Sequence, residues 1–508
     1  MAHPIFWPRR SIFYPIGNTS PVCLTKDIAP DQSASVLLLG CGDPRNILYT
    51  LYASGTDKAI CMSRLELLVD QAPDTCMAAA VRRMLDFTCC DIDPAVLARN
   101  YLLFTMLVDD QISLDYVWDI FYDFYLKEKP SEELVEHCHK LVDISEDMDS
   151  WRASKYGLIL KFCTERTRTE LRKHWTLYSR FESLPEIRKA KVKAEFLAGM
   201  DIQVDVRQTL SVARSAGPLF SDALTPTFDH FTHLWRAGIH SVNPEDLEGA
   251  THVNPTFAYS AAKEGFDVHY GIDGLSAFYL APAFTCLKSG PLSAEDPMAA
   301  MVLVAKTQFQ HWCRTFKTVT KTNDPQLVIM VFAGEALAFC NALHYYSASG
   351  TPSATPVYTM PWKSSLIVLD SGDYGDGASP VPPKTFDVID TSNLTDHLGF
   401  LNVLVTTRPL LTVLASSTLH TEALLPLGPN AVSRFAEHFC GDVDAVCLLL
   451  DLAPSASLSK FTTTSNVHEV LAYRSFEGTQ QFHERVAWKI TSAADPLPGA
   501  NVIHIRGD

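Results

Sequence analysis

Short apolar runs alternate with helical patterns towards both ends of the chain. Val36–Leu39 and Phe87–Cys90 are apolar along nearly their whole length, as expected of strands that are buried on both faces. Between them, Ile47–Tyr52 carries apolar residues at the spacing of one helix face. The alternation predicts an α/β fold with a mostly parallel sheet covered by helices. The later predicted strands are Leu327–Phe332, Ser364–Leu369, Phe386–Ile389 and Val446–Leu450.

Helical patterns dominate the middle of the chain, where a hairpin is also expected around Tyr259–Tyr270. A stretch of this length is too long for a loop, so we predict a helical lobe that is inserted into the sheet domain. The helices predicted in this lobe and just before it are Ala95–Leu107, Tyr116–Leu126, Glu132–Val142, Ser154–Lys173, Pro185–Ala198, Phe228–Gly238 and Ala299–Phe316.

The sheet domain resumes after the lobe. Helices are predicted over Glu335–Leu343 and Asp396–Leu404, and Arg485–Ile490 with Val502–Ile505 is expected to form an antiparallel edge. A chain of 508 residues exceeds one simple core. The predicted division is an N-terminal arm (1–34), the first part of the sheet domain (35–110), the helical lobe (111–325), the second part of the sheet domain (326–455) and a C-terminal extension (456–508).

Residues 56–81 break the strand–helix–strand rhythm, because the second strand of such a unit normally follows the helix within a few residues. The segment has no clean period over more than two turns. We interpret it as an insertion, or as non-coding sequence retained in the gene model, that is looped out at the surface.

Composition narrows the class of protein. A hydrophobic content of 47% with 20% charged residues is typical of a globular fold. The net charge of −16 argues against nucleic-acid binding by the whole chain. No run reaches the roughly 18 apolar residues of a membrane span, and the first residues lack the apolar stretch of a signal peptide. We therefore expect a soluble cytoplasmic protein without membrane contact.

Cysteine and acidic clusters do not indicate a metal site. The 13 cysteines include no C-x-x-C pair and are expected to be reduced thiols. In His137-Cys138-His139 the two imidazoles diverge on a helix. Asp370, Asp373 and Asp376 lack the spacing of a calcium loop and are expected to lie in a solvated turn.

One basic segment, Lys161–Lys193, stands out in this acidic chain. It is a candidate docking site for an acidic protein partner or RNA, as is the helical lobe for a protein partner. The alternative is a solvated helix face in which Glu165 and Glu170 pair with nearby basic residues, and the pattern favours that alternative.

The strongest functional signal is a glycine pair followed by an acid. Gly40-Cys41-Gly42 ends the first predicted strand, and Asp91 ends the second. Glycines allow a ligand to approach the backbone closely, and an acid at the next strand end accepts hydrogen bonds from ribose hydroxyls. The pair therefore predicts a nucleotide-type ligand, with Asp43 and Asp93 close by.

Four segments, taken in order, resemble the motifs of class I S-adenosylmethionine (SAM) methyltransferases. They are Gly40-Cys41-Gly42-Asp43, Asp91-Ile92-Asp93, Ala333-Gly334-Glu335-Ala336 and Phe386–Asn393. The resemblance implies a Rossmann-like sheet that binds SAM through Gly40, Gly42, Asp91 and Glu335. It also implies that Asp390 or Asn393 orients a methyl acceptor.

The chain departs from that pattern in three places. The loop has two glycines, with Asp43-Pro44 where a third is usual, and an acid here could hinder the ligand's carboxylate. Glu335 replaces an Asp. The Pro-Pro-aromatic signature of amino-group methylation is absent after Asp390.

Over its length the chain resembles fungal proteins that carry the uncharacterised domain DUF4470. Val36–Leu48, Asp86–Asn100 and Asp387–Leu394 carry this resemblance. A similar domain opens dynein axonemal assembly factor 3, a cytosolic protein. Many fungal relatives also have a MYND zinc finger, which the isolated Cys440 and Cys447 do not match.

Two interpretations stay open at this point. In the first, the chain binds SAM and transfers its methyl group. In the second, the same fold has lost catalysis and serves as an assembly or scaffolding module, as the dynein-factor resemblance implies. Both predict that the strand ends at Gly40, Asp91, Ala333 and Ile389 lie side by side.

Overall fold

A computed structural model describes residues 13–492, apart from several internal segments. These segments are 56–82, 206–210, 262–263, 267, 270–271, 285–295, 322–325, 351, 353–354, 361–362, 376–377, 425–426, 429–436, 438, 440, 456–466 and 471–479. The predicted insertion at 56–81 and the predicted strand Val502–Ile505 therefore lie outside the described residues.

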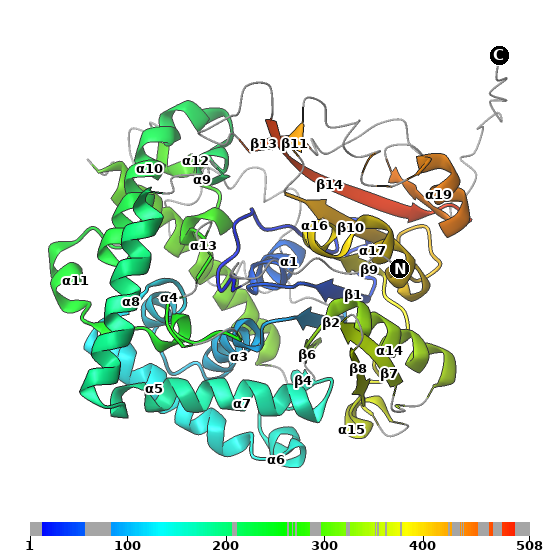
Figure 1. Ribbon diagram of the computed structural model, residues 1–508, viewed down its shortest axis with the longest axis horizontal. Helices are drawn as coiled ribbons and strands as arrows, with labels where there is room; N and C mark the ends of the chain where they lie inside the picture. The colour runs from blue at the N-terminus through cyan, green and yellow to red at the C-terminus, as the bar shows by residue number, and fades with distance from the viewer. Residues whose placement is uncertain are drawn as a thin grey trace.

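A large, mostly parallel sheet forms the centre of the molecule (Figure 1). Its middle strands are β1 (Ala34–Leu39), β2 (Leu85–Asp91), β6 (Leu327–Ala333) and β9 (Val388–Asp390). They are adjacent in the order β9-β1-β2-β6, and each neighbouring pair is parallel. The four predicted strand ends do lie side by side at the carboxyl edge, so this prediction is confirmed.

The outer strands extend the sheet in both directions. Beside β9 lies β10 (Thr418–Ala423), which is parallel to it, and β14 (Gln480–Ile490) then pairs antiparallel with β10. Arg485–Ile490 is thus confirmed as an antiparallel strand, while its predicted pairing with Val502–Ile505 falls outside the described residues. Three short strands also pair with β14: β11 (Leu427–Gly428), β12 (Leu452–Pro454) and β13 (Val467–Val470).

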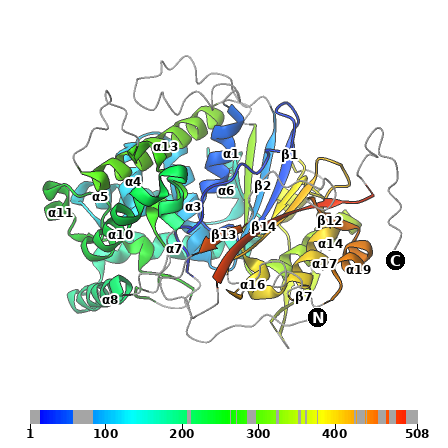
Figure 2. The ribbon, with the colours of Figure 1, turned by 90° about the horizontal axis from the view of Figure 1, so that it is seen from above.

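Helices cover both faces of the sheet (Figure 2). Val36 and Leu38 of β1 pack in one apolar cluster with α1 (Arg45–Gly55), α3 (Pro94–Asp109) and α13 (Pro297–Thr320). The alternate residues of β1 pack in a second cluster with α14 (Ala336–Ser349) and α17 (Phe400–Thr407). Because successive side chains of a strand alternate between its faces, this strand is buried on both sides.

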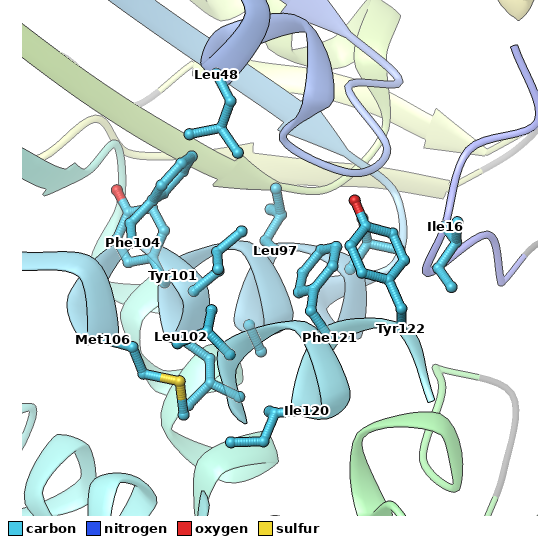
Figure 3. Packing of buried hydrophobic residues seen from close by; sticks show 14 of the residues in the cluster. Ile16, Leu48, Leu97, Tyr101, Leu102, Phe104, Met106, Ile120, Phe121 and Tyr122 are labelled. Atoms are coloured by element: carbon cyan, nitrogen blue, oxygen red, sulfur yellow. The ribbon is translucent and has the colours of Figure 1, made fainter. Parts of the chain in front are cut away.

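The helical lobe shares the first of these cores. Leu97, Leu102 and Phe104 of α3 pack between Leu48 of α1 and residues of α4 (Leu114–Tyr122), as Figure 3 shows. The remaining lobe elements are β3 (Tyr125–Leu126), α5 (Glu128–Ile144), α6 (Met148–Ala153), α7 (Glu165–Arg180), α8 (Glu186–Asp205), α9 (Ser211–Arg214), α10 (Phe220–Ala237), α11 (Pro244–Gly249), β5 (His252–Val253) and α12 (Ala281–Phe284).

The predicted helix Ser154–Lys173 is wrong before Glu165 and confirmed from there on, where α7 begins. Its centre is the strand β4 (Leu160–Phe162), which pairs parallel with β6 at the edge of the main sheet. Helix α7 begins only after Thr164, whose hydroxyl accepts a hydrogen bond from the backbone N–H of Thr167 and so caps the helix. A three-residue strand is too short to produce a period in the sequence.

Two other sequence predictions assign the wrong secondary structure. The predicted strand Val446–Leu450 belongs to helix α19 (Val443–Leu450), because the Asp442 carboxylate caps its first turn at Ala445. The predicted helix Tyr116–Leu126 ends at Tyr122, and the following residues form β3, which pairs with β5.

Short elements complete the second half of the chain. The predicted strand Ser364–Leu369 corresponds to β8 (Lys363–Ile367), which forms a separate two-stranded sheet with β7 (Thr355–Met360). Helices α15 (Ser371–Tyr374) and α16 (Leu394–Leu398) flank β9. Among the helices of the described residues, none is long and apolar enough to cross a membrane.

Candidate functional site

The glycine loop turns sharply at the carboxyl end of β1. Gly40 and Gly42 have φ angles of +64° and +56°, which L side chains rarely adopt. A Cβ added at Gly40 would lie 3.1 Å from Leu394 Cδ2, whereas one added at Gly42 would meet no atom within 4 Å. Asn100 Nδ2 donates to the Gly42 carbonyl at 2.7 Å. The loop is therefore held in place while open space remains beside Gly42.

Asp91 holds this loop from the end of β2. Its Oδ2 accepts a hydrogen bond from the Gly42 N–H at 3.1 Å, and its Oδ1 accepts one from the Asp93 N–H at 3.0 Å. Burial raises the pKa of the Asp91 carboxyl to about 6. An ionised carboxylate accepts roughly four hydrogen bonds, so two backbone donors leave it with acceptor capacity.

Asp93 binds the chain's own backbone. Its carboxylate accepts from Ala95 N at 2.9 Å, which caps α3, and from Ala261 N at 3.2 Å. The residue is 1% exposed. Asp93 thus anchors a lobe segment to the start of α3, next to the predicted site.

Asp43 binds the N-terminal strap, by which we mean residues 13–25. Its Oδ2 accepts from the Gly17 N–H at 2.7 Å, and its Oδ1 accepts from the Arg45 guanidinium at 2.8 Å. Arg45 also donates to Thr19 Oγ1 at 2.8 Å. The strap is fixed further along by the Leu24 N–H, which donates to Thr50 Oγ1 at 3.0 Å. Arg45 therefore balances the charge that was expected to hinder a ligand's carboxylate.

Glu335 lies at the end of β6 and caps α14. Its Oε1 accepts from Leu337 N at 3.0 Å and its Oε2 accepts from Ala338 N at 2.7 Å. Burial raises the pKa of this carboxyl. Each carboxylate oxygen thus has a backbone partner, which is what the first turn of a helix requires.

The two candidates for orienting a methyl acceptor have different surroundings. Asp390, at the end of β9, is 4% exposed and accepts from Ser392 N at 2.9 Å and from the Arg485 guanidinium. Asn393 lies at the start of α16, where its Nδ2 is 3.3 Å from Nε2 of His397 in an exposed contact. The structure brings Asp390 into an ion pair and leaves Asn393 half-buried.

Sequence reasoning missed His420. It lies in β10, where its Cα is the register partner of Asp390 Cα, and it is 4% exposed. Burial and the nearby charge of Arg485 hold the pKa of its imidazole well below the usual range. The segment Thr418–Ala423 has too many polar residues to be recognised as a buried strand, so the sequence offered no signal for this residue.

The basic segment Lys161–Lys193 is largely engaged within the chain. Arg168 donates to the carbonyl of Ser145, and Arg172 donates to the carbonyl of Val142 at 3.1 Å. These carbonyls belong to the end of α5, where the helix leaves acceptors unpaired. These two arginines therefore cap the C-terminal end of α5.

The expected solvated turn is wrong at Asp370 and Asp373, whereas Asp376 lies outside the described residues. Asp373 is 4% exposed and lies 3.3 Å from the Lys161 ammonium, while Asp370 pairs with Arg152 and caps α15. Asp373 is buried and Asp370 half-buried because these carboxylates pair with cations of the neighbouring β4 and α6, whereas Ser371 and Gly372 between them are exposed. No three His, Cys, Asp or Glu side chains among the described residues are arranged to hold a metal ion.

Comparisons with known proteins give one match. A family model described as "Domain of unknown function (DUF4470)" matches residues 15–126, which run from the strap through β1, β2 and α3 to the end of β3. No curated protein and no solved structure matches the chain. A DUF4470 domain therefore contains the glycine loop, Asp91 and Asp93, whereas Glu335 and Asp390 lie outside it.

Proposed function

We propose that this protein binds S-adenosylmethionine at the carboxyl edge of its sheet, in the manner of a class I methyltransferase. The observation that carries the proposal is the adjacency of the four motif-bearing strand ends. The chain order reverses at β1, which has β2 on one side and β9 on the other. Ligands of open α/β sheets bind outside the carboxyl ends of the strands at such a switch point.

The residues at this point suit the ligand. Gly42 leaves room where any other residue would place a Cβ, and Asp91 has acceptor capacity for ribose hydroxyls. Asp43 is neutralised by Arg45, so it does not repel a carboxylate from this position. When bound, SAM would supply a methyl group on a positively charged sulfur.

Glu335 is the exception among the predicted ligand groups. In the methyltransferase motif that Ala333–Ala336 resembles, the acid approaches the adenine amine; here both oxygens of Glu335 cap α14, and each keeps a second lone pair, as the oxygens of Asp91 do. We assign ribose recognition to Asp91 and the capping of α14 to Glu335.

Calorimetry with SAM and S-adenosylhomocysteine tests the proposal. The wild type should bind both, and D91N should bind at least 10-fold more weakly, since a hydrogen bond to a charged group contributes about 1.5–3 kcal/mol.

A series of nucleosides separates loss of the ribose contact from a disturbed glycine loop. Wild type should prefer adenosine over 2′-deoxyadenosine or 3′-deoxyadenosine, and D91N should lose that preference. Equal binding of all three nucleosides by wild type would remove ribose recognition from Asp91.

A second candidate function is an assembly or scaffolding role without methyl transfer. It is favoured by the number of polar groups at the strand ends that already have partners within the chain, above all Asp390 with Arg485 and Asp43 with Gly17. A cytoplasmic scaffold needs no ligand at this edge. A folded wild type that binds neither SAM nor S-adenosylhomocysteine would favour it.

A further inference from the structure

Helices α5 and α7 lie side by side in the lobe and run in opposite directions. The Arg172 guanidinium donates to the carbonyl of Val142 at 3.1 Å. Further back along α7, the Arg168 guanidinium donates to the carbonyl of Ser145, so residue numbers rise along α5 as they fall along α7. Both helices bury one side in the same apolar cluster, to which Trp175 belongs. Their opposite sides form one solvent-facing surface, which we call the α5–α7 face.

The α7 half of this face is basic. Arg166, Lys173 and Arg180 recur at seven-residue intervals, which keeps them on one side of the helix, and all three are exposed. Lys173 pairs with Glu170 at 2.8 Å. Arg166 and Arg180 form no ion pair with the described residues, so both cations are available to a partner. Leu177, which is 37% exposed, lies between Lys173 and Arg180 on the same side.

The α5 half of the face is acidic. Glu132, Glu136 and Asp143 are exposed on one side of the helix. Glu146 is exposed just beyond the helix end. Helix α5 carries five acidic and two basic side chains, whereas α7 carries two acidic and five basic ones, so their formal charges are −3 and +3. The two charges therefore form adjacent stripes on one surface.

We propose that the α5–α7 face binds the same face of a second copy of this chain. A two-fold axis parallel to the helices and midway between them places α5 of each copy on α7 of the other, so that opposite charges meet. An axis across the helices would bring like charges together. Two-fold interfaces are self-complementary in this way. Nucleic acid does not fit the same face, because the acidic stripe and the net charge of −16 repel phosphates.

The same orientation brings the charges to matching levels. An axis parallel to the helices does not shift them along their length, so each α5 residue faces the α7 residue that it is level with inside one copy. Arg172 is level with Val142, and further along Tyr178 lies near Cys138. Each outward cation of α7 is then within about one turn, roughly 5 Å along the axis, of an acid on the second copy. The pairs are Lys173 with Asp143, Arg180 with Glu132 or Glu136, and Arg166 with Glu146.

The size of the face fits a weak dimer. Helix α5 has 17 residues and is about 25 Å long, and two packed helices span about 20 Å, which gives a contact of about 500 Å² per copy. This area is at the lower end of specific interfaces. Exposed ion pairs contribute little individually and are screened by salt, while Leu177 adds an apolar contact. We therefore expect a dimer that salt dissociates, whether or not the protein binds SAM.

Analytical ultracentrifugation measures this association directly. The chain should show a reversible monomer–dimer equilibrium at about 50 mM salt, and the dimer dissociation constant should rise at least tenfold at about 500 mM, because several exposed ion pairs are screened together. A chain that stays monomeric at its highest soluble concentration in low salt, or a dimer whose dissociation constant ignores salt, would overturn the inference.

Charge reversal locates the interface. E136K places a lysine opposite Arg180 of the second copy, and R180E places a glutamate opposite Glu136. Each variant alone should dimerise at least tenfold more weakly than the wild type, because attractive contacts become repulsive at both ends of the dimer. An equal mixture of the two variants should recover the wild-type affinity, since the heterodimer pairs the new lysine with the new glutamate and keeps the native pair at its other end.

The matched controls are K193E and E248K, which reverse exposed charges on α8 and α11. Both should dimerise like the wild type. The mixing experiment also separates loss of the contact from misfolding, because a misfolded variant cannot be rescued by its partner. Unchanged dimerisation in both E136K and R180E, or a mixture that dimerises no better than either variant alone, would overturn the inference.

Discussion

The backbone N–H of Gly17 donates a 2.7 Å hydrogen bond to the Asp43 carboxylate, 26 residues further along the chain. This bond fastens the strap to the glycine loop. The Asp43-Pro44 departure from the methyltransferase pattern thus has a structural role, because the acid that replaces a ligand-facing glycine binds the chain's own N-terminal segment and Arg45.

Substitution of Asp43 by alanine should destabilise the fold strongly. The side chain is 1% exposed, and its loss would leave the Gly17 N–H without this acceptor and the Arg45 guanidinium without its counter-charge. Removing one partner of a buried ion pair costs about 3–5 kcal/mol. D442A is the matched control, because Asp442 caps α19 at an exposed position and its loss should cost about 1 kcal/mol. Urea denaturation measures both, and equal losses would mean that the strap contributes nothing through Asp43.

Gly42→Ala should separate ligand binding from stability. Gly42 and Gly217 both have φ of +56° and no atom within 4 Å of an added Cβ, so each alanine should cost about 1–2 kcal/mol from backbone strain alone. Only G42A places its methyl group in the proposed ligand space. We expect calorimetry to find SAM binding at least 10-fold weaker in G42A and unchanged in G217A. Unchanged binding in both variants would place the ligand away from the glycine loop.

Asp86 in β2 should make stability depend on pH. Burial raises its pKa to about 7, and its Oδ1 has no hydrogen-bond partner among the described residues. A raised folded pKa means that the folded state binds the proton more tightly than the unfolded chain, whose pKa is about 3.9. The stabilisation is therefore complete below about pH 4 and is lost as pH rises through 7.

The D86N substitution replaces the titrating carboxyl of Asp86 with an amide that does not titrate. Relative to the wild type, D86N should gain roughly 2–3 kcal/mol in free energy of unfolding between pH 5 and pH 8. The control is D110N. Lys317 and Lys321 lower the pKa of Asp110 to about 2, so its contribution changes only below pH 4 and should be constant over this range. A difference between D86N and the wild type that does not vary with pH would show that Asp86 is ionised in the folded state at pH 5.

Glu335 should matter for stability and not for the ligand. Its alanine variant removes the cap of α14 and should lose about 1 kcal/mol in thermal or urea denaturation. E335D, which keeps a good capping residue, should recover most of that loss. SAM affinity should stay within twofold of the wild type in both variants. A large loss of affinity in E335A with an unchanged melting temperature would return Glu335 to the ligand site.

The backbone of the site could be predicted from the sequence because each strand end carries its own local signal. An apolar run followed by Gly40, Asp91 or Ala333 marks the end of a buried parallel strand, and parallel strands place such ends on one edge. The roles of the side chains could not be predicted. Whether Glu335 reaches for a ligand or caps a helix depends on the direction of α14, which no local pattern records.

The missed elements share a physical cause. Strand β10 buries Thr418, His420 and Glu422, so its composition looks like that of a loop. Strand β4 is only three residues long, and it is held by pairing with β6, 169 positions away at Ile329–Leu160. Long-range pairing overrides local propensity in both cases.

The most direct test of the central claim is a crystal structure of the protein grown with S-adenosylhomocysteine. The account predicts ligand density over Gly42 at the carboxyl edge of the sheet, with the ribose hydroxyls within hydrogen-bond distance of the Asp91 carboxylate and the homocysteine sulfur on the side of Asp390. A ligand bound elsewhere, or a well-ordered structure in which this edge holds no ligand at saturating concentration, would contradict it.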